Sequence, residues 1–313
     1  MTWVGISAGT IPPGRWEGEL MHSFERYHPA VNFIWFLCVI LFSMIFMNPV
    51  CLGISLAFSF LTALNMRGRP MMGFGLRVLL PVMILTALIN PAFNHGGVTL
   101  ICYLPGGNPL TLESILFGLA ASAMIGSVIC WFSCYNRIMT SDRFIYLFGR
   151  IIPSLSLIFS MILRFVPRFG AQLKRIHGAQ KAMRGEGESM KGRIRSGVGV
   201  FSSMIDWALE SSIRTSDSMK SRGYGRRGRT AFSIYRFDRR DGAMLTLILA
   251  LSFYVLAGKL AGAADYRYFP EFQAAAGGVY TLTVFLAYGA LCAIPLLIEL
   301  RERIKWNAFE SNN

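Results

Sequence analysis

Charged residues are scarce in this sequence: they make up 15% of its 313 residues, whereas hydrophobic residues make up 53%. Soluble domains usually carry about 25% charged residues. The shortage therefore argues against a soluble protein and favours one that lies in lipid. The sequence also lacks a GxxxxGK[ST] phosphate-binding loop, so nucleotide chemistry has to come from another protein. We expect no catalytic site in this chain.

Groups of metal-binding residues are missing as well. The six cysteines are scattered without a CxxC pair, and the four histidines lack the spacing of metal ligands. Cys130 and Cys134 share a helix face, but without a histidine nearby they fit the role of small apolar packing residues. His95 fits a turn or capping role better than that of a ligand. We expect no metal site and no other cofactor.

Positive charge is abundant but unevenly distributed. The net charge is +14, and the segment from Arg164 to Arg240 holds 18 of the 31 basic residues with only six acidic ones, a net +12. Loops rich in Lys and Arg stay on the cytoplasmic side of membrane proteins. This basic segment is therefore predicted to be cytoplasmic.

Several apolar segments approach or exceed the roughly 20 residues that a transmembrane helix needs. None of them contains Asp or Glu. The predicted fold is an all-α polytopic membrane protein with about six such helices. They are Ala30–Met47, Val50–Asn65, Val78–Asn94, Ser114–Tyr135, Gly242–Ala264 and Gln273–Ile298.

The segment Phe144–Leu163 is ambiguous, because Arg150 and Pro153 interrupt it and leave only 13 clean apolar residues from Ile151. We predict an interfacial or re-entrant helix here, because a full crossing would place the basic segment outside. Both termini are then cytoplasmic, the loop Met66–Arg77 is internal, and the loop Phe93–Thr111 is external. The predicted regions are 1–29 (N-terminal segment), 30–136 (helices one to four), 137–166 (interfacial helix), 167–241 (cytoplasmic module), 242–298 (helices five and six) and 299–313 (C-terminal tail).

Two amphipathic helices are predicted in the cytoplasmic module, and they end alike. Met183-Arg184-Gly185 closes the first and Ser221-Arg222-Gly223 closes the second. Glycine favours the position just after a helix, and a cation there suits the negative end of the helix dipole. The dipole alone explains a single Arg-Gly ending. Two copies suggest guanidinium groups presented at rigid helix tips to a partner.

These endings resemble the paired motifs of the T components of energy-coupling factor (ECF) transporters, the cobalt-transporter transmembrane subunit family. The stretch from Ser156 to Pro167 is similar to the approach to the first coupling helix of that family, and Tyr27-His28-Pro29 resembles its N-terminal entry. Two further stretches, Asn90–Gly97 and Pro105–Glu113, resemble its external loops. The resemblance runs from about residue 25 to 300, and the paired arginines are its most specific part.

The resemblance implies that two ABC-type ATPase subunits bind two long cytoplasmic coupling helices, with Arg184 and Arg222 each entering a groove on one ATPase. A separate membrane protein, the substrate-binding S component, would pack against this chain and deliver a vitamin or metal ion. The docking residues would be Met183, Arg184, Gly185, Ser221, Arg222 and Gly223. Membrane lipid is a further partner, because the arginines from Arg226 to Arg240 fit a membrane-surface anchor. We expect no nucleic-acid partner.

Three other functions remain open. An intramembrane enzyme would need polar or acidic groups in its spans, and the predicted spans lack acids. A permease subunit of another ABC importer class would have one coupling helix per subunit, against the two predicted here. A basic module that binds nucleic acid or anionic lipid without ATPases would bind in a strongly salt-dependent manner.

Overall fold

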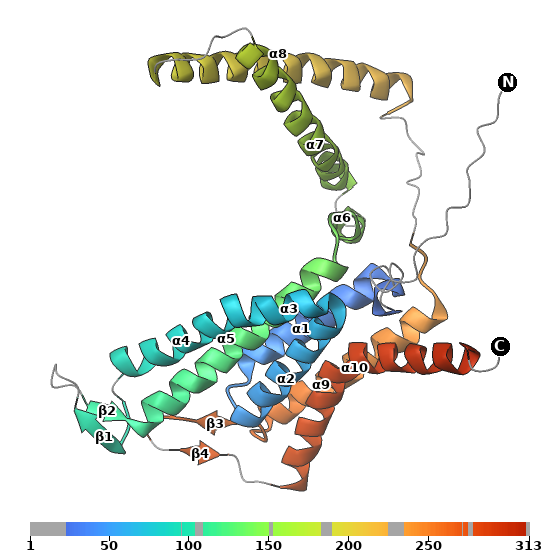
Figure 1. The fold of residues 1–313 in the computed structure, drawn as a ribbon. Helices are drawn as coiled ribbons and strands as arrows, with labels where there is room; N and C mark the ends of the chain where they lie inside the picture. The colour runs from blue at the N-terminus through green and yellow to red at the C-terminus, as the bar shows by residue number, and fades with distance from the viewer. Residues whose placement is uncertain are drawn as a thin grey trace. The chain divides into compact units, whose positions relative to one another are not determined.

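The computed structural model describes residues 23–94, 96–103, 109–149, 153–182, 190–224, 235–270, 272–274 and 278–310. The chain divides into two compact units, Met1–Thr140 with Tyr235–Asn313, and Ser141–Ile234. Each unit is mainly helical, which confirms the predicted all-α class (Figure 1). We refer to the first as the membrane unit and to the second as the helical module.

The membrane unit contains the apolar helices. Among the described residues, five are long and apolar enough to cross a membrane: Pro49–Arg67, Pro70–Phe93, Leu112–Ile138, Arg239–Leu260 and Val279–Glu302. The helix Pro29–Ile45 is shorter, at 17 residues, the lower end of the range that can span a bilayer. The elements are η2 (Ser23–Arg26), α1 (Pro29–Ile45), α2 (Pro49–Arg67), α3 (Arg69–Phe74), η3 (Gly75–Leu79), α4 (Leu80–Phe93), α5 (Leu112–Ile138), α9 (Arg239–Leu260) and α10 (Val279–Glu310).

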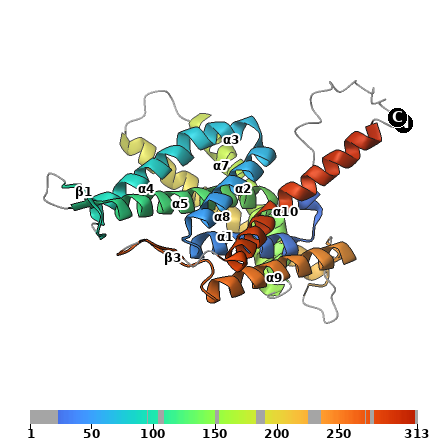
Figure 2. The ribbon, with the colours of Figure 1, turned by 90° about the horizontal axis from the view of Figure 1, so that it is seen from below.

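Two short antiparallel hairpins accompany these helices. The first pairs β1 (Leu100–Tyr103) with β2 (Pro109–Thr111), and the second pairs β3 (Tyr266–Arg267) with β4 (Gln273–Ala274). Figures 1 and 2 both show α4 running alongside α5, with the first hairpin at the end of this pair. The first hairpin falls in the predicted external loop Phe93–Thr111, whereas β4 of the second hairpin falls in the predicted start of the sixth span.

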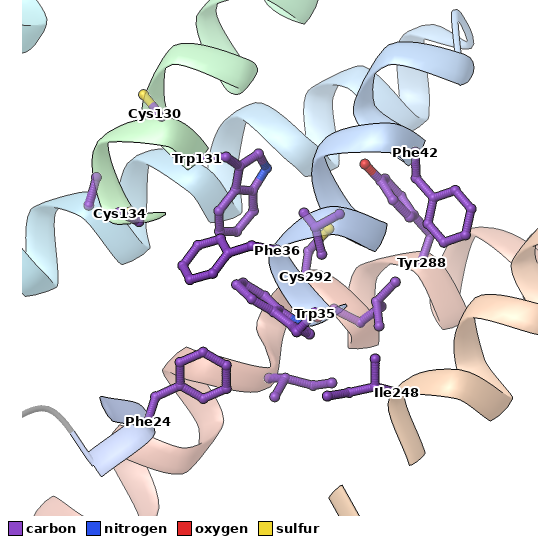
Figure 3. Packing of buried hydrophobic residues seen from close by; sticks show 14 of the residues in the cluster. Phe24, Trp35, Phe36, Phe42, Cys130, Trp131, Cys134, Ile248, Tyr288 and Cys292 are labelled. Atoms are coloured by element: carbon purple, nitrogen blue, oxygen red, sulfur yellow. The ribbon is translucent and has the colours of Figure 1, made fainter. Parts of the chain in front are cut away.

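The core of the membrane unit is built around α1. Trp35 is fully buried, and its indole packs edge-on against Trp131 of α5 at 5.4 Å between ring centroids. Its Nε1 donates a hydrogen bond to the backbone oxygen of Leu291 in α10 at 2.9 Å. Figure 3 shows side chains from η2, α1, α5, α9 and α10 gathered around this tryptophan. The helix α1 thus lies at the centre of the packing.

A small polar network lies inside the same core. The hydroxyl of Ser43 is 2.7 Å from that of Ser55 and 3.2 Å from that of Tyr288, and Trp131 Nε1 donates to the Ser55 hydroxyl at 3.1 Å. Polar groups inside a membrane need internal partners because no water is available there. This network links α1, α2, α5 and α10 through hydrogen bonds as well as apolar contacts.

The structure corrects two predicted boundaries in the membrane unit. The predicted loop Met66–Arg77 is helical except at Gly68, whose φ of +63° allows a one-residue turn between α2 and α3. Gln273 belongs to a strand, so the last helix begins at Val279 instead. The helix α10 continues to Glu310, into the predicted C-terminal tail that begins at residue 299.

The helical module contains α6 (Ser141–Gly149), α7 (Pro153–Ala182) and α8 (Met190–Ser221). The sequence predicts one interfacial or re-entrant helix over Phe144–Leu163 and a new region after residue 166. Instead, α7 starts at Pro153 and runs through Pro167 without a break. Proline removes a single backbone hydrogen bond, and in α7 this loss does not end the helix.

Candidate functional site

The C-terminus of α8 forms a rigid tip that presents Arg222. Gly223 adopts φ of +80°, a left-handed conformation that glycine reaches without strain. The Tyr224 amide donates to the Met219 oxygen at 3.0 Å, and the Gly223 amide donates to the Lys220 oxygen at 3.0 Å. These two bonds define a Schellman motif, with Arg222 as the C-cap residue directly after the last helical residue, Ser221, and Gly223 at the next position.

This motif fixes the backbone on both sides of Arg222 while the side chain stays exposed. The Arg222 amide itself donates to the Ser218 oxygen at 3.3 Å, which continues the helical pattern to the tip. A cation at this position is favoured by the partial negative charge at the helix C-terminus. The predicted second Arg-Gly ending is therefore confirmed as a helix tip, formed by Ser221, Arg222 and Gly223.

Met183, Arg184 and Gly185 lie outside the described residues, which reach Ala182 at the end of α7. The helix leading to them is present as predicted, with Leu173 and Ile176 on it.

The helices α7 and α8 pack against each other at two places. The ring of Phe169 meets Trp207 edge-on at 5.2 Å between centroids. The Gln180 amide, oriented so that both of its hydrogen bonds are made, donates to the Ser196 oxygen at 3.1 Å and accepts from the Val200 amide at 3.2 Å. These contacts fix one face of α8 against α7.

Beyond the Phe169–Trp207 contact, the two helices enclose a groove of about 660 Å³. Four arginines line it, Arg164 and Arg168 from α7 and Arg214 and Arg222 from α8, with Glu210 as the single acidic residue. Its other lining residues include aromatic, methionine and hydroxyl side chains. We call this the basic groove, lined by Ser160, Met161, Arg164, Phe165, Arg168, Trp207, Glu210, Ser211, Arg214, Thr215, Ser218, Met219, Arg222 and Tyr224.

The opposite face of α8 carries an exposed apolar stripe. An α-helix turns about 100° per residue, so Leu209 lies roughly 200° around the helix from Trp207. Large apolar side chains that recur every three or four residues follow this face. The members of the stripe are Ile194, Val198, Phe201, Ile205, Leu209 and Ile213, each between 44% and 67% exposed. The helix α8 therefore has a basic face toward the groove and an apolar face on its other side.

Sequence reasoning found the tip but missed the basic groove. Arg164, Arg168 and Arg214 were counted as part of the positive segment and given no individual role. Arg164 and Arg168 are four residues apart, and this spacing places them on one helix face. Arg214 and Arg222 reach the same groove because Trp207 packs against α7. This tertiary contact has no local sequence signal.

The structure offers no metal site among its described residues, where no three His, Cys, Asp or Glu side chains lie close enough to hold an ion. Cys130 and Cys134 are buried on α5 as free thiols, in agreement with the packing role predicted for them.

These features define a multi-pass helical membrane protein with a separate helical module. A family model for the cobalt transport protein family, CbiQ, matches residues 22–232, more than half of the chain. The chain belongs to this family, which comprises membrane components of ECF-type transporters. A search of curated proteins found no match to the chain. The predicted recognition is thereby confirmed, and the chain is a membrane transport component.

Proposed function

We propose that this chain is the T component of an ECF-type importer, a subunit that transmits motion from two cytoplasmic ABC-type ATPases to a substrate-binding S component. It resides in the cell membrane with both termini in the cytoplasm. The cargo, a vitamin or a metal ion, is selected by the S component. The chain itself hydrolyses no ATP. The observation that carries the proposal is the Schellman-locked tip that exposes Arg222.

A locked tip suits the transmission of force. The backbone around Arg222 is fixed by hydrogen bonds to Met219 and Lys220, so a displacement of the guanidinium moves the helix axis with it. Planar guanidinium groups also make paired hydrogen bonds to carboxylates or carbonyl groups of a partner. In this proposal Arg222 enters a groove on one ATPase, and Arg184 does the same on the other.

The apolar stripe of α8 supports the second half of the proposal. Six large apolar side chains are exposed along about five turns of a helix in a strongly basic segment. Exposed apolar surface of this extent marks a contact with protein or membrane. We assign this stripe as the surface that contacts the S component. When the ATPases close on ATP, the helix tips move, and the stripe carries this movement to the S component, which topples and releases its cargo.

Charge reversal at both tips tests the proposal. Arg184→Glu combined with Arg222→Glu is expected to abolish copurification with the two ATPase subunits and to stop uptake of the cargo. Removing one partner of a buried charge pair costs roughly 2–5 kcal/mol, so each single substitution should weaken assembly and the pair should abolish it. Arg195→Glu is the matched control, because Arg195 is exposed on α8 but does not line the groove.

Normal copurification and uptake in the double variant would refute the proposal. If only one of the two arginines matters, the chain contacts ATPases through a single coupling helix, as in other ABC importer classes. Weakening of assembly by both single substitutions, with Arg195→Glu unaffected, is the pattern expected of a T component.

A further inference from the structure

The last helix of the membrane unit is too long to lie wholly inside a bilayer. The helix α10 has 32 residues, which corresponds to about 48 Å at 1.5 Å per residue. The hydrocarbon core of a bilayer is about 30 Å thick, so even a helix tilted by about 40° would extend beyond it. The first charged residue of α10 is Glu299. The excess length therefore lies at the C-terminal end of the helix.

A proline lies just before this end, and a side chain of α1 compensates for it. Pro295 has no backbone N–H, so the carbonyl oxygen of Leu291, four residues earlier, loses its helical donor. The Nε1 of Trp35 donates to this oxygen at 2.9 Å, and both Trp35 and Leu291 are fully buried. Sharp bends in helices occur mostly at proline, and Figure 1 shows that α10 changes direction along its length. The core of the membrane unit thus stabilises a bend at Pro295.

Beyond the bend, α10 carries exposed apolar side chains on one face. Leu297, Leu300 and Ile304 are 56%, 54% and 68% exposed, and their spacings of three and four residues place them on the same side of the helix. Ile298 lies about 200° around the helix from Leu300 and packs against the core. We call Leu297, Leu300 and Ile304 the α10 stripe. It faces away from the protein.

The α10 stripe continues a surface that already faces lipid. Leu286, within the membrane span of α10, is 65% exposed. Leu297 follows it after 11 residues, or about three helical turns, so the two leucines lie on the same face. The stripe is therefore an extension of the lipid-facing side of the span, which favours lipid over a partner protein as its environment.

The position of Pro295 sets the direction of the bend. The proline ring pushes against the carbonyl group of Leu291, which opens the helix on the proline side and bends it toward the opposite side. Pro295 is buried, and the members of the α10 stripe lie about 140–200° around the helix from it. The helix therefore bends toward the face that carries the stripe, outward from the core and over the lipid.

Basic side chains flank the stripe. Arg301 and Lys305 are both exposed, and each lies within about 100° of Ile304 around the helix. An exposed apolar face with basic residues beside it is typical of helices that lie at a membrane surface, where the apolar face enters the acyl boundary and the cations meet lipid phosphates.

We infer that the part of α10 beyond Pro295 lies along the membrane surface, with the α10 stripe in lipid and Arg301 and Lys305 at the phosphate groups. Trp35 holds the bend that turns the helix onto this surface. In the proposed orientation of the chain the surface is the cytoplasmic one. The inference goes beyond the proposed function, because it requires neither the ATPases nor the S component.

Spin labelling tests the inference in the full-length chain, reconstituted alone into nanodiscs of phosphatidylcholine and phosphatidylglycerol. The labelled variants are Leu300→Cys, Ile304→Cys, Arg301→Cys and Lys305→Cys, each in a background in which the exposed Cys102 is replaced by serine. Power-saturation EPR compares collisions of the label with oxygen, which dissolves in lipid, and with a water-soluble nickel complex. We expect the ratio of oxygen to nickel collisions to be on the order of fivefold higher at the two stripe positions than at the two basic positions.

Two reference positions define the possible outcomes. Leu286→Cys reports lipid, and Asp217→Cys on α8 reports water. If the stripe labels collide with nickel as often as the Asp217→Cys label, the segment is in water and the inference is wrong. If they are shielded from both reagents, the stripe packs against protein, and this result also overturns the inference.

Core variants test the bend. Trp35→Phe keeps an aromatic ring but removes the donor to Leu291, and Pro295→Ala restores a backbone donor and lets the helix straighten, so each should lower the contrast at Ile304→Cys by about half or more. Trp131→Phe is the matched control, because its Nε1 donates to Ser55 on α2 and not to α10. It should leave the contrast unchanged. Full contrast in both Trp35→Phe and Pro295→Ala would overturn the role of the bend.

Discussion

Gly223 offers a direct test of whether the helix tip positions Arg222. Its φ of +80° is left-handed, and a side chain there costs about 1–2 kcal/mol. Gly223→Ala should therefore lower the equilibrium ratio of the Schellman geometry to other backbone conformations by about tenfold, because 1.4 kcal/mol corresponds to a factor of ten. If the ATPase recognises Arg222 only in that geometry, its affinity falls by up to the same factor although Arg222 is intact.

The series can be controlled within the same helix. Gly223→Asn should lose less affinity than Gly223→Ala, because asparagine adopts the left-handed region more readily. Gly197→Ala is the matched control. Gly197 lies inside α8, and a Cβ there would meet no atom within 4 Å. This change should favour the helix by up to about 1 kcal/mol and leave ATPase affinity unchanged.

The measurement is the equilibrium affinity of the purified chain for the ATPase subunits, with circular dichroism to confirm that helical content is retained. Binding of Gly223→Ala as tight as wild type would refute the reasoning that the locked tip presents Arg222. A higher affinity in Gly197→Ala than in the wild type would show that helix stability, not tip geometry, controls binding.

Three further predictions concern the membrane unit. A Cβ at Gly258 would lie 2.5 Å from Val284 Cγ2, so Gly258→Ala should destabilise the protein by about 1–3 kcal/mol. Val284→Ala should partly rescue the variant in a double-mutant cycle of thermal stability. Additive losses would contradict this contact. Cys102 is the exposed cysteine of the six, so an impermeant maleimide should label this residue in intact cells. In a Cys102→Ser background, Asp217→Cys should react with the same maleimide only after permeabilisation. The reverse pattern would invert the topology. Asp241 accepts hydrogen bonds from the His28 and Asp238 amides at 3.0 Å each and so caps the start of α9. Asp241→Asn should therefore lower the stability of the protein by about 1 kcal/mol. An unchanged melting temperature would argue against this capping role.

The apolar segments were predicted well because each carries its own signal. A helix in lipid satisfies its backbone hydrogen bonds within itself, so long apolar runs mark helices without knowledge of their neighbours. The end of α8 was predicted for a similar reason. An Arg-Gly sequence after an amphipathic pattern contains the residues that a Schellman motif requires, and Gly223 adopts the expected conformation.

The boundaries that were missed depend on short turns and on tertiary packing. A single glycine, Gly68, replaces a predicted loop of several residues between α2 and α3. Likewise, Gln273 pairs with Arg267 in a hairpin and so does not extend the last helix. In both cases the pattern of apolar residues was read correctly, but it does not encode where the backbone turns.

The basic groove could not be predicted because it depends on which helix faces meet. The contact between Phe169 and Trp207 sets the rotation of α8 against α7. With a rotation of half a turn, the apolar stripe would pack against α7 and the arginines of α8 would face elsewhere. Sequence periodicity gives the two faces of each helix but not the choice between them.

The most direct test is a structure of the chain bound to its two ATPase subunits in a lipid bilayer. The account predicts that the side chains of Arg184 and Arg222 each occupy a groove on a different ATPase, with the apolar stripe of α8 turned away from both. A structure in which these arginines point into lipid, or fold back onto their own chain with no ATPase within reach, would contradict it.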